Sequence, residues 1–172
     1  MGNVMDAARF FIDTFRSSED LMTNLRLNKF LYFAQARSLV RLKQPLFDAP
    51  LQAWHYGPVV PLVHSQYKKD GKRPISDRAS YSLEGFTPEQ RETMIDVARV
   101  YGRYSTAAIV SMSRPSDDLR DLGRDEGTCD LSNEKVMECF QQKGPLGRFS
   151  ISEKMPRLGR RDSDGYLCIP GE

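Results

Sequence analysis

Apolar residues near the start of the chain recur with the spacing of an amphipathic helix. Between residues 3 and 16 they fall at i, i+4, i+7, i+8 and i+11, which places them on one helical face. A longer pattern over residues 24–43 covers more than one face and predicts a central, largely buried helix, which Pro45 ends. Four basic residues are expected to leave a narrow solvent-exposed edge on this helix: Lys29, Arg37, Arg41 and Lys43.

The pattern then changes from a helical period to alternation. Residues 46–56 alternate apolar and polar positions, which predicts a short extended segment. Gly57-Pro58 is expected to break it and to begin a third helix, because proline is favoured in a first helical turn. That helix is expected to continue to Lys69 and to stop at Gly71. The turn itself is treated as a structural motif made of Gly57, Pro58, Val59, Val60 and Pro61.

Capping signals mark the later helices. Thr87, Pro88 and Gln90 form a capping-box pattern at the start of one helix that ends near residue 102. Ser105 is expected to cap the next helix, and Ser132 the last, over residues 133–142. The expected fold class is therefore mainly α: a compact helical domain of about five to seven helices with a short strand or hairpin. Residues 1–143 would form this domain, and residues 144–172 a C-terminal extension, either a short β-hairpin or an arm.

Composition and charge narrow the class of protein. The chain has 172 residues, 40% of them hydrophobic, which suits one folded domain. No apolar run is long enough to span a membrane, and the N-terminus lacks a signal-peptide layout, so a cytoplasmic protein is expected. The net charge of +2, with both signs interspersed, does not favour nucleic acid as a partner.

No pattern for catalysis, a metal or a cofactor is present. His55 and His64 are nine positions apart with a Gly-Pro break between them, so they do not form a zinc-binding helix face, and no nucleophile elbow or phosphate loop occurs. The cysteines, at positions 129, 139 and 168, are too far apart in sequence for a structural zinc site. Acidic residues between 117 and 130 alternate with arginines, which is typical of a salt-bridged surface. We expect no catalytic residue, no metal site and no cofactor.

Three short motifs in the first half of the chain occur in a recognisable order. They are "NKFLYFAQ" at residues 28–35, "PLF" at residues 45–47 and "AWHYGPVVP" at residues 53–61. In this order and spacing they resemble the Panacea domain, the SocA-like antitoxin family of bacteria and phages. The resemblance is dense over residues 4–75 and weaker afterwards.

The resemblance implies an antitoxin that binds and neutralises a cognate toxin, encoded by an adjacent gene, through direct protein–protein contact and without catalysis. Because tryptophan and tyrosine are enriched where interfaces bind tightly, Trp54, His55 and Tyr56 are candidate partner-binding residues. Tyr32 and Gln35, on the central helix, are weaker candidates. A core position for Trp54 is favoured over an interface position, because it is the only tryptophan of the chain.

Two other functions stay open at this stage. The fold could serve an adaptor or regulator of phage or host machinery, with residues 146–172 delivering a bound protein to its destination. Less favoured is a hydrolase or transferase that would use His55 or His64 together with an acid from the segment 117–130.

Overall fold

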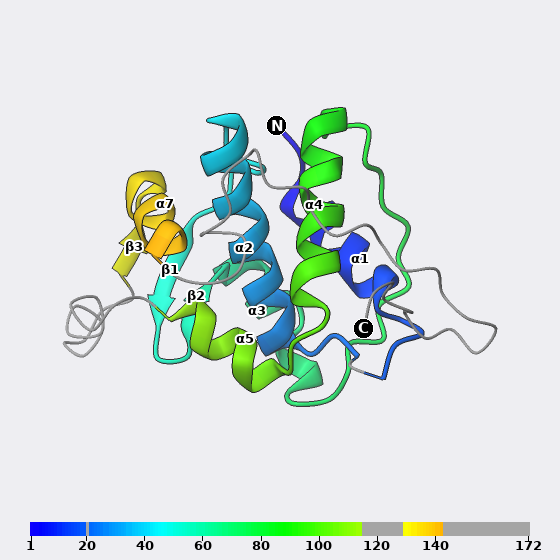
Figure 1. The fold of residues 1–172 in the computed structure, drawn as a ribbon. Coiled ribbons are helices and arrows are strands. Elements are labelled where there is room, and N and C mark those ends of the chain that lie inside the picture. Colours follow the sequence, from blue (N-terminus) through cyan, green and yellow to red (C-terminus); the bar gives the residue numbers. More distant parts are fainter. Residues whose placement is uncertain (20, 115–128, 143–172) are drawn as a thin grey trace, which may run out of the picture.

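The computed structural model describes residues 1–19, 21–114 and 129–142. Helices surround a long central helix, and a small antiparallel sheet covers one side of it (Figure 1). The mainly α fold with a short hairpin is as predicted from the sequence. In chain order the elements are α1 (Val4–Thr14), α2 (Asn24–Leu42), β1 (Leu51–Trp54), β2 (Gly57–Val59), α3 (Pro61–Gln66), the 3₁₀ helix η1 (Lys68–Asp70), α4 (Pro88–Tyr101), α5 (Thr106–Ser113), β3 (Cys129–Leu131) and α7 (Asn133–Gln142).

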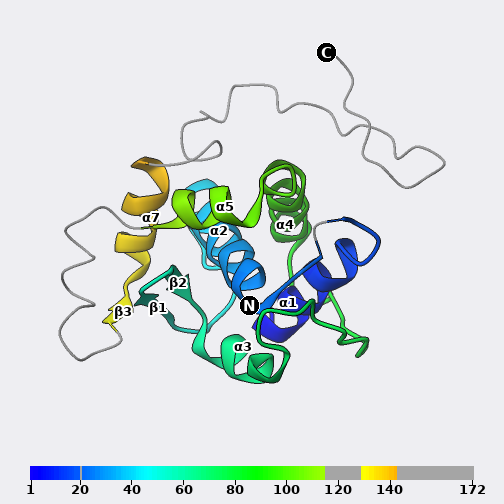
Figure 2. The same ribbon diagram turned by 90° about the horizontal axis from the view of Figure 1, so that it is seen from below.

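Helix α2 is the centre of the fold. It contacts α1, α3, α4, α5, α7 and β2, so it is enclosed on nearly every side (Figures 1 and 2). Its apolar residues are correspondingly buried, and Phe33 stacks on Tyr101 of α4 with ring centroids 3.8 Å apart. Thr23 caps the start of α2 by accepting from the Arg26 N–H, and Lys43 ends it in the left-handed conformation. The prediction of a central helix is confirmed.

The expected solvent-exposed edge of α2 is wrong for two of its four residues. Lys29 is 0% exposed and Arg37 is buried, whereas Arg41 is half-buried and Lys43 is exposed. The reason is tertiary: β2 packs over the α2 face that carries Lys29, and α4 covers the face that carries Arg37. Lys29 enters the interior with the Pro58 carbonyl as the acceptor of its ammonium, and Arg37 lies near the opposite charge of Asp96 on α4.

The central motif forms a β-hairpin. β1 pairs antiparallel with β2, with Trp54 opposite Gly57, so His55 and Tyr56 form a two-residue turn. On its other edge β1 pairs antiparallel with β3, and the sheet order is β2-β1-β3. The prediction that Gly57-Pro58 starts a helix is wrong: both residues lie in β2, and α3 begins at Pro61. Gly57 has φ +94°, a conformation that no helix uses and that favours glycine.

The predicted caps of the later helices are confirmed. Thr87 and Gln90 form the reciprocal capping box at the start of α4. Ser105 accepts from the Ala108 N–H at α5, and Ser132 accepts from the Lys135 N–H at α7. β3 was not predicted, because three residues carry no recognisable alternation. Its only pairing partner among the described residues is β1, far away in sequence.

Several predictions fall outside the described residues. These include the C-terminal extension 144–172 with its possible hairpin, and most of the acidic segment between 117 and 130. The division into residues 1–143 and 144–172, and the adaptor hypothesis that depends on the tail, stay predictions. No helix in the described part of the chain is long and apolar enough to cross a membrane.

Candidate partner-binding surface

The inner side of the hairpin is held to α2 by polar side chains. The Lys29 ammonium donates to the Pro58 carbonyl with an Nζ–O distance of 2.8 Å. One residue earlier along the helix, Asn28 accepts the Val60 N–H through Oδ1 at 2.9 Å. The Asn28 amide in turn donates to the carbonyl and side-chain oxygens of Asn24, both at 2.9 Å. These bonds tie the second strand of the hairpin, and the residue that follows it, to the middle of the core.

Lys29 is an unusual residue to find at this position. It is fully buried, and burial lowers its pKa to about 7 from 10.5, with a further lowering from the charge of Arg114. The lysine therefore spends much of its time uncharged near neutral pH, in a site where a neutral amine still donates to a carbonyl. Its polar partner is a backbone oxygen from a strand almost thirty positions later, which is why the sequence alone suggested a solvated lysine.

Gly57 of the hairpin lies close to Lys29 of α2 and Ser113 of α5. A Cβ atom at this position would lie 2.9 Å from the Ser113 Oγ and 3.5 Å from the Lys29 Nζ. Its φ of +94° also disfavours any side chain. Gly57 to Pro61 were predicted to form a structural motif that starts a helix; in the structure Gly57 leaves the turn at a positive φ, and Pro61 begins α3.

The outer side of the hairpin has the opposite character. Tyr56 is 55% exposed, His55 is exposed beside it, and their rings meet edge to face with centroids 4.7 Å apart. Trp54 is half-buried, so the core position favoured for it is not observed. Its indole N–H donates to Gln52, and its ring contacts the His64 ring of α3 edge to face at 4.8 Å. We call Trp54, His55, Tyr56 and His64 the turn surface.

Tyr32 and Gln35 do not belong to this surface. Tyr32 is 2% exposed, and burial raises the pKa of its hydroxyl. Gln35 is 3% exposed and bonds three backbone groups: it accepts from the N–H groups of Leu46 and Phe47 and donates to the Phe47 carbonyl. Both side chains are therefore structural, and the prediction that either one contacts a partner is not supported by its burial.

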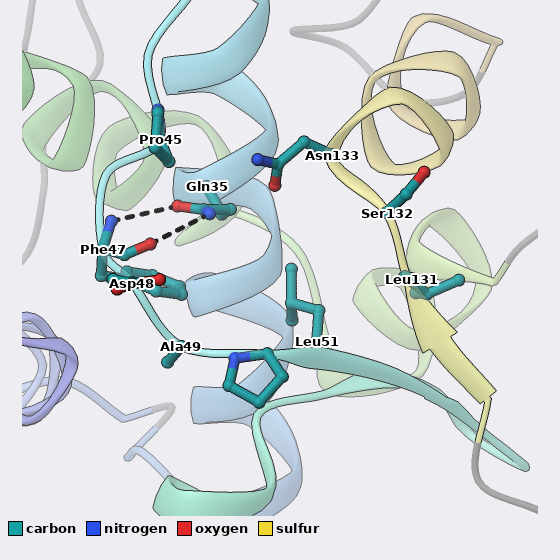
Figure 3. Close-up of a pocket in the computed structure, with 10 residues that line it drawn as sticks. Gln35, Pro45, Phe47, Asp48, Ala49, Leu51, Leu131, Ser132 and Asn133 are labelled. Carbon is teal, nitrogen blue, oxygen red and sulfur yellow. Dashed lines mark hydrogen bonds between the residues drawn. The ribbon is translucent and has the colours of Figure 1, made fainter.

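Gln35 instead forms the floor of a groove that sequence reasoning missed. The groove has a volume of about 360 Å³ and lies between the segment 45–51 and the junction of β3 with α7 (Figure 3). Its walls are mainly apolar or small on one side, and Ser132 and Asn133 lie on the other. No short sequence pattern could have indicated it, because its two walls come from segments about eighty positions apart.

The two histidines lack the surroundings of an acid–base pair within the described residues. His55 contacts Tyr56, and His64 contacts Trp54. Burial lowers the pKa of His64, and the charges of Lys68 and Lys29 lower it further. From the acidic segment, Asp130 is described, and it accepts from Gln52 rather than from a histidine. No group of three potential metal ligands occurs in the part of the chain that the structure describes.

A comparison with known protein families identifies the family of this chain. A family model described as "Antitoxin SocA-like, Panacea domain" matches residues 27–117, more than half of the chain. The chain belongs to this family. The match covers α2 except for its first three residues, the hairpin, α3, α4 and α5, and it continues well beyond Ile75, where the motif resemblance weakened.

One curated relative gives the same assignment. Antitoxin SocA of Caulobacter vibrioides is 31% identical to this Panacea-domain chain over 119 residues. The aligned part is 63% of this chain and 63% of the relative, so the chain spans less than two thirds of that protein's length. No solved structure matches this chain. The turn surface lies inside the family match, whereas β3, α7 and one wall of the groove lie outside it.

Proposed function

We propose that this chain is an antitoxin that binds a cognate toxin directly, through the turn surface, and neutralises it without catalysing a reaction. The toxin would be the product of an adjacent bacterial or phage gene, and the complex would form in the cytoplasm. Membership in the SocA-like family supports the antitoxin role, and so does the name of the C. vibrioides relative.

The observation that carries the binding surface is the exposure of Tyr56 on a rigid support. The strand that follows it, Gly57–Val59, is buried, and Lys29 and Asn28 bond the hairpin to α2. An aromatic side chain that projects from a fixed hairpin loses little conformational freedom on binding. Tyrosine and tryptophan are also the residue types that contribute most at protein interfaces. His55, beside Tyr56 in the turn, and Trp54, at the end of β1, belong to the same surface.

The test begins with growth and co-purification. The adjacent open reading frame is expressed alone and together with this chain; we expect toxicity that co-expression relieves, and a stoichiometric complex. The double variant His55→Ala/Tyr56→Ala should lose rescue and weaken the complex by at least about tenfold, or 1.4 kcal/mol. Ile95→Ala is the matched control, since Ile95 is an exposed apolar residue on α4, away from the hairpin (Figure 1).

Different outcomes would contradict different parts of the proposal. Absence of a complex with every neighbouring gene product would remove the antitoxin function. A complex that Ile95→Ala weakens while His55→Ala/Tyr56→Ala leaves it intact would place the interface elsewhere. Rescue that persists after the complex is abolished would point to a mechanism other than direct contact.

A further inference from the structure

A run of exposed basic residues directly follows α3. The segment 68–73 reads KKDGKR, and its four cationic side chains are exposed. We call Lys68, Lys69, Lys72 and Arg73 the basic segment. η1 places the two lysines at the end of α3, and Arg73 folds back to donate to the carbonyls of Lys69 and Asp70. The segment is thus ordered, with its charges held on one short stretch of the surface.

These cations lack the carboxylate partners that several other basic residues of the described structure have. Arg9, Arg16, Arg41, Arg99 and Lys135 each lie within 4.0 Å of a carboxylate oxygen. No salt bridge between described residues involves a member of the basic segment. Its single acid, Asp70, leaves a local excess of positive charge, although the whole chain is nearly neutral at +2.

The basic segment is continuous with the turn surface. The Trp54 ring touches the His64 ring, and Lys68 follows His64 by four residues at the start of η1. α3, which carries His64, lies beside the hairpin (Figure 2). Trp54 therefore contacts the helix whose end carries the basic segment, with Tyr56 at the adjoining turn of the hairpin. Exposed lysines alone are ordinary on any protein; their contiguity with exposed aromatic rings is what indicates an interface.

From this arrangement we infer that the partner presents an acidic protein segment, with carboxylates facing the basic segment and an apolar or aromatic side chain against Trp54 and Tyr56. This inference rests on the proposed function and adds the chemistry of the partner. Charge complementarity accelerates encounter and sets orientation, while the desolvated rings supply most of the affinity. Nucleic acid is the less favoured occupant, because the positive charge is confined to one short segment.

Binding at this surface can be followed by tryptophan fluorescence, because Trp54 is the only tryptophan of the chain. In the full-length protein its emission is titrated with a tryptophan-free peptide of glutamate and phenylalanine, and separately with a single-stranded oligonucleotide of equal charge. We expect the peptide to shift the emission saturably, with an affinity that falls as ionic strength rises. A flat peptide titration, or a response to the oligonucleotide alone, would overturn the inference.

A charge-reversal pair completes the test on both the peptide and the toxin complex. Lys68→Glu/Lys69→Glu should weaken binding by about tenfold or more at low ionic strength. Lys43→Glu/Lys135→Glu is the matched control: it changes the net charge equally but lies at the far end of α2 and on α7, and it should stay within about twofold. Before the binding assays, both double variants are checked to have the same thermal unfolding temperature as the wild type.

The possible failures are distinguishable. A toxin complex that forms normally with Lys68→Glu/Lys69→Glu would overturn the acidic-partner inference and leave the antitoxin function standing. If no neighbouring gene product binds at all, the antitoxin function fails, and the peptide titration still decides whether the surface selects acidic segments.

Discussion

The two sides of the hairpin share nine consecutive residues, 53–61, and differ in almost every physical property. On the inner side, Gly57 to Val60 are buried, and Lys29 and Asn28 fasten them to α2. On the outer side, His55 and Tyr56 are exposed, and no hydrogen bond between described side chains ties their rings down. The residues of the inner side stabilise the fold, whereas those of the outer side are exposed to solvent.

This difference explains why so many distinctive residues gather in one stretch. A glycine at φ +94° and prolines at positions 58 and 61 are needed to turn the chain and to begin α3. The aromatic residues are not needed for that turn, because only Trp54 makes substantial contact with the rest of the fold. Mutations on the two sides should therefore separate stability from binding, and the following predictions are ordered by their cost to stability.

The largest cost should come from Gly57→Ala. The new Cβ would adopt an unfavourable φ and would also crowd the Ser113 hydroxyl at 2.9 Å, so we expect a loss of about 3 kcal/mol in unfolding free energy. Gly85→Ala is the control, since its nearest neighbours lie at an ordinary 3.6 Å and its cost should be below about 1 kcal/mol. Chemical denaturation measures both unfolding free energies. Equal losses in the two variants would show that the fold tolerates a Cβ atom at position 57.

Asn28→Leu should be the next most costly change. It keeps the number and branching of the side-chain heavy atoms but leaves the buried Val60 N–H without its acceptor, at a cost of about 2 to 3 kcal/mol. Asn133→Leu, at an exposed position at the start of α7, should change stability by less than about 0.5 kcal/mol. Hydrogen exchange at the Val60 amide gives a second readout, and unchanged protection in Asn28→Leu would contradict this role.

Lys29→Met should change how stability depends on pH. The pKa of Lys29 is about 7 in the folded chain and 10.5 as its ordinary value, so between these values the unfolded chain binds more protons. Stability therefore rises with pH across this window, and the unfavourable contribution of the buried charge is fully present below pH 7. Relative to Lys29→Met, the wild type should gain about 2 kcal/mol between pH 7 and about pH 9.

The control for this titration is Lys43→Met, at the exposed end of the same helix, which should keep the wild-type slope. Unfolding free energies are measured by denaturant titration at each pH. Parallel curves for wild type and Lys29→Met would mean that the lysine titrates no differently in the folded chain than in the unfolded one.

The smallest cost to stability should come from His55→Ala/Tyr56→Ala. Because both side chains are exposed at the turn, the unfolding free energy should change by no more than about 0.5 kcal/mol each. The same variant is expected to lose toxin binding, so a thermal melt beside a binding assay tests the comparison directly. A strongly destabilised variant would show that the outer side also supports the fold.

Much of the fold could be predicted from local signals. The apolar spacing of α1 and α2, the Thr87–Gln90 capping box and the Ser132 cap each involve residues within a few positions of one another, so the sequence displays them directly. Of the candidate site, Trp54, His55 and Tyr56 could be selected by residue type. Tyr32 and Gln35 could not be excluded, because nothing near them in the sequence shows that other elements cover them.

By itself, then, the sequence determined which segments become helices, where most of them start, that the extended segment is interrupted near Gly57, and which family the chain belongs to. The tertiary structure decided which side chains are available to a partner. Lys29 is buried because Pro58 accepts its N–H from 29 positions away, and Asn28 because Val60 donates to it from 32 positions away. Such pairings depend on how α2 and the hairpin pack together, and no local pattern encodes that packing.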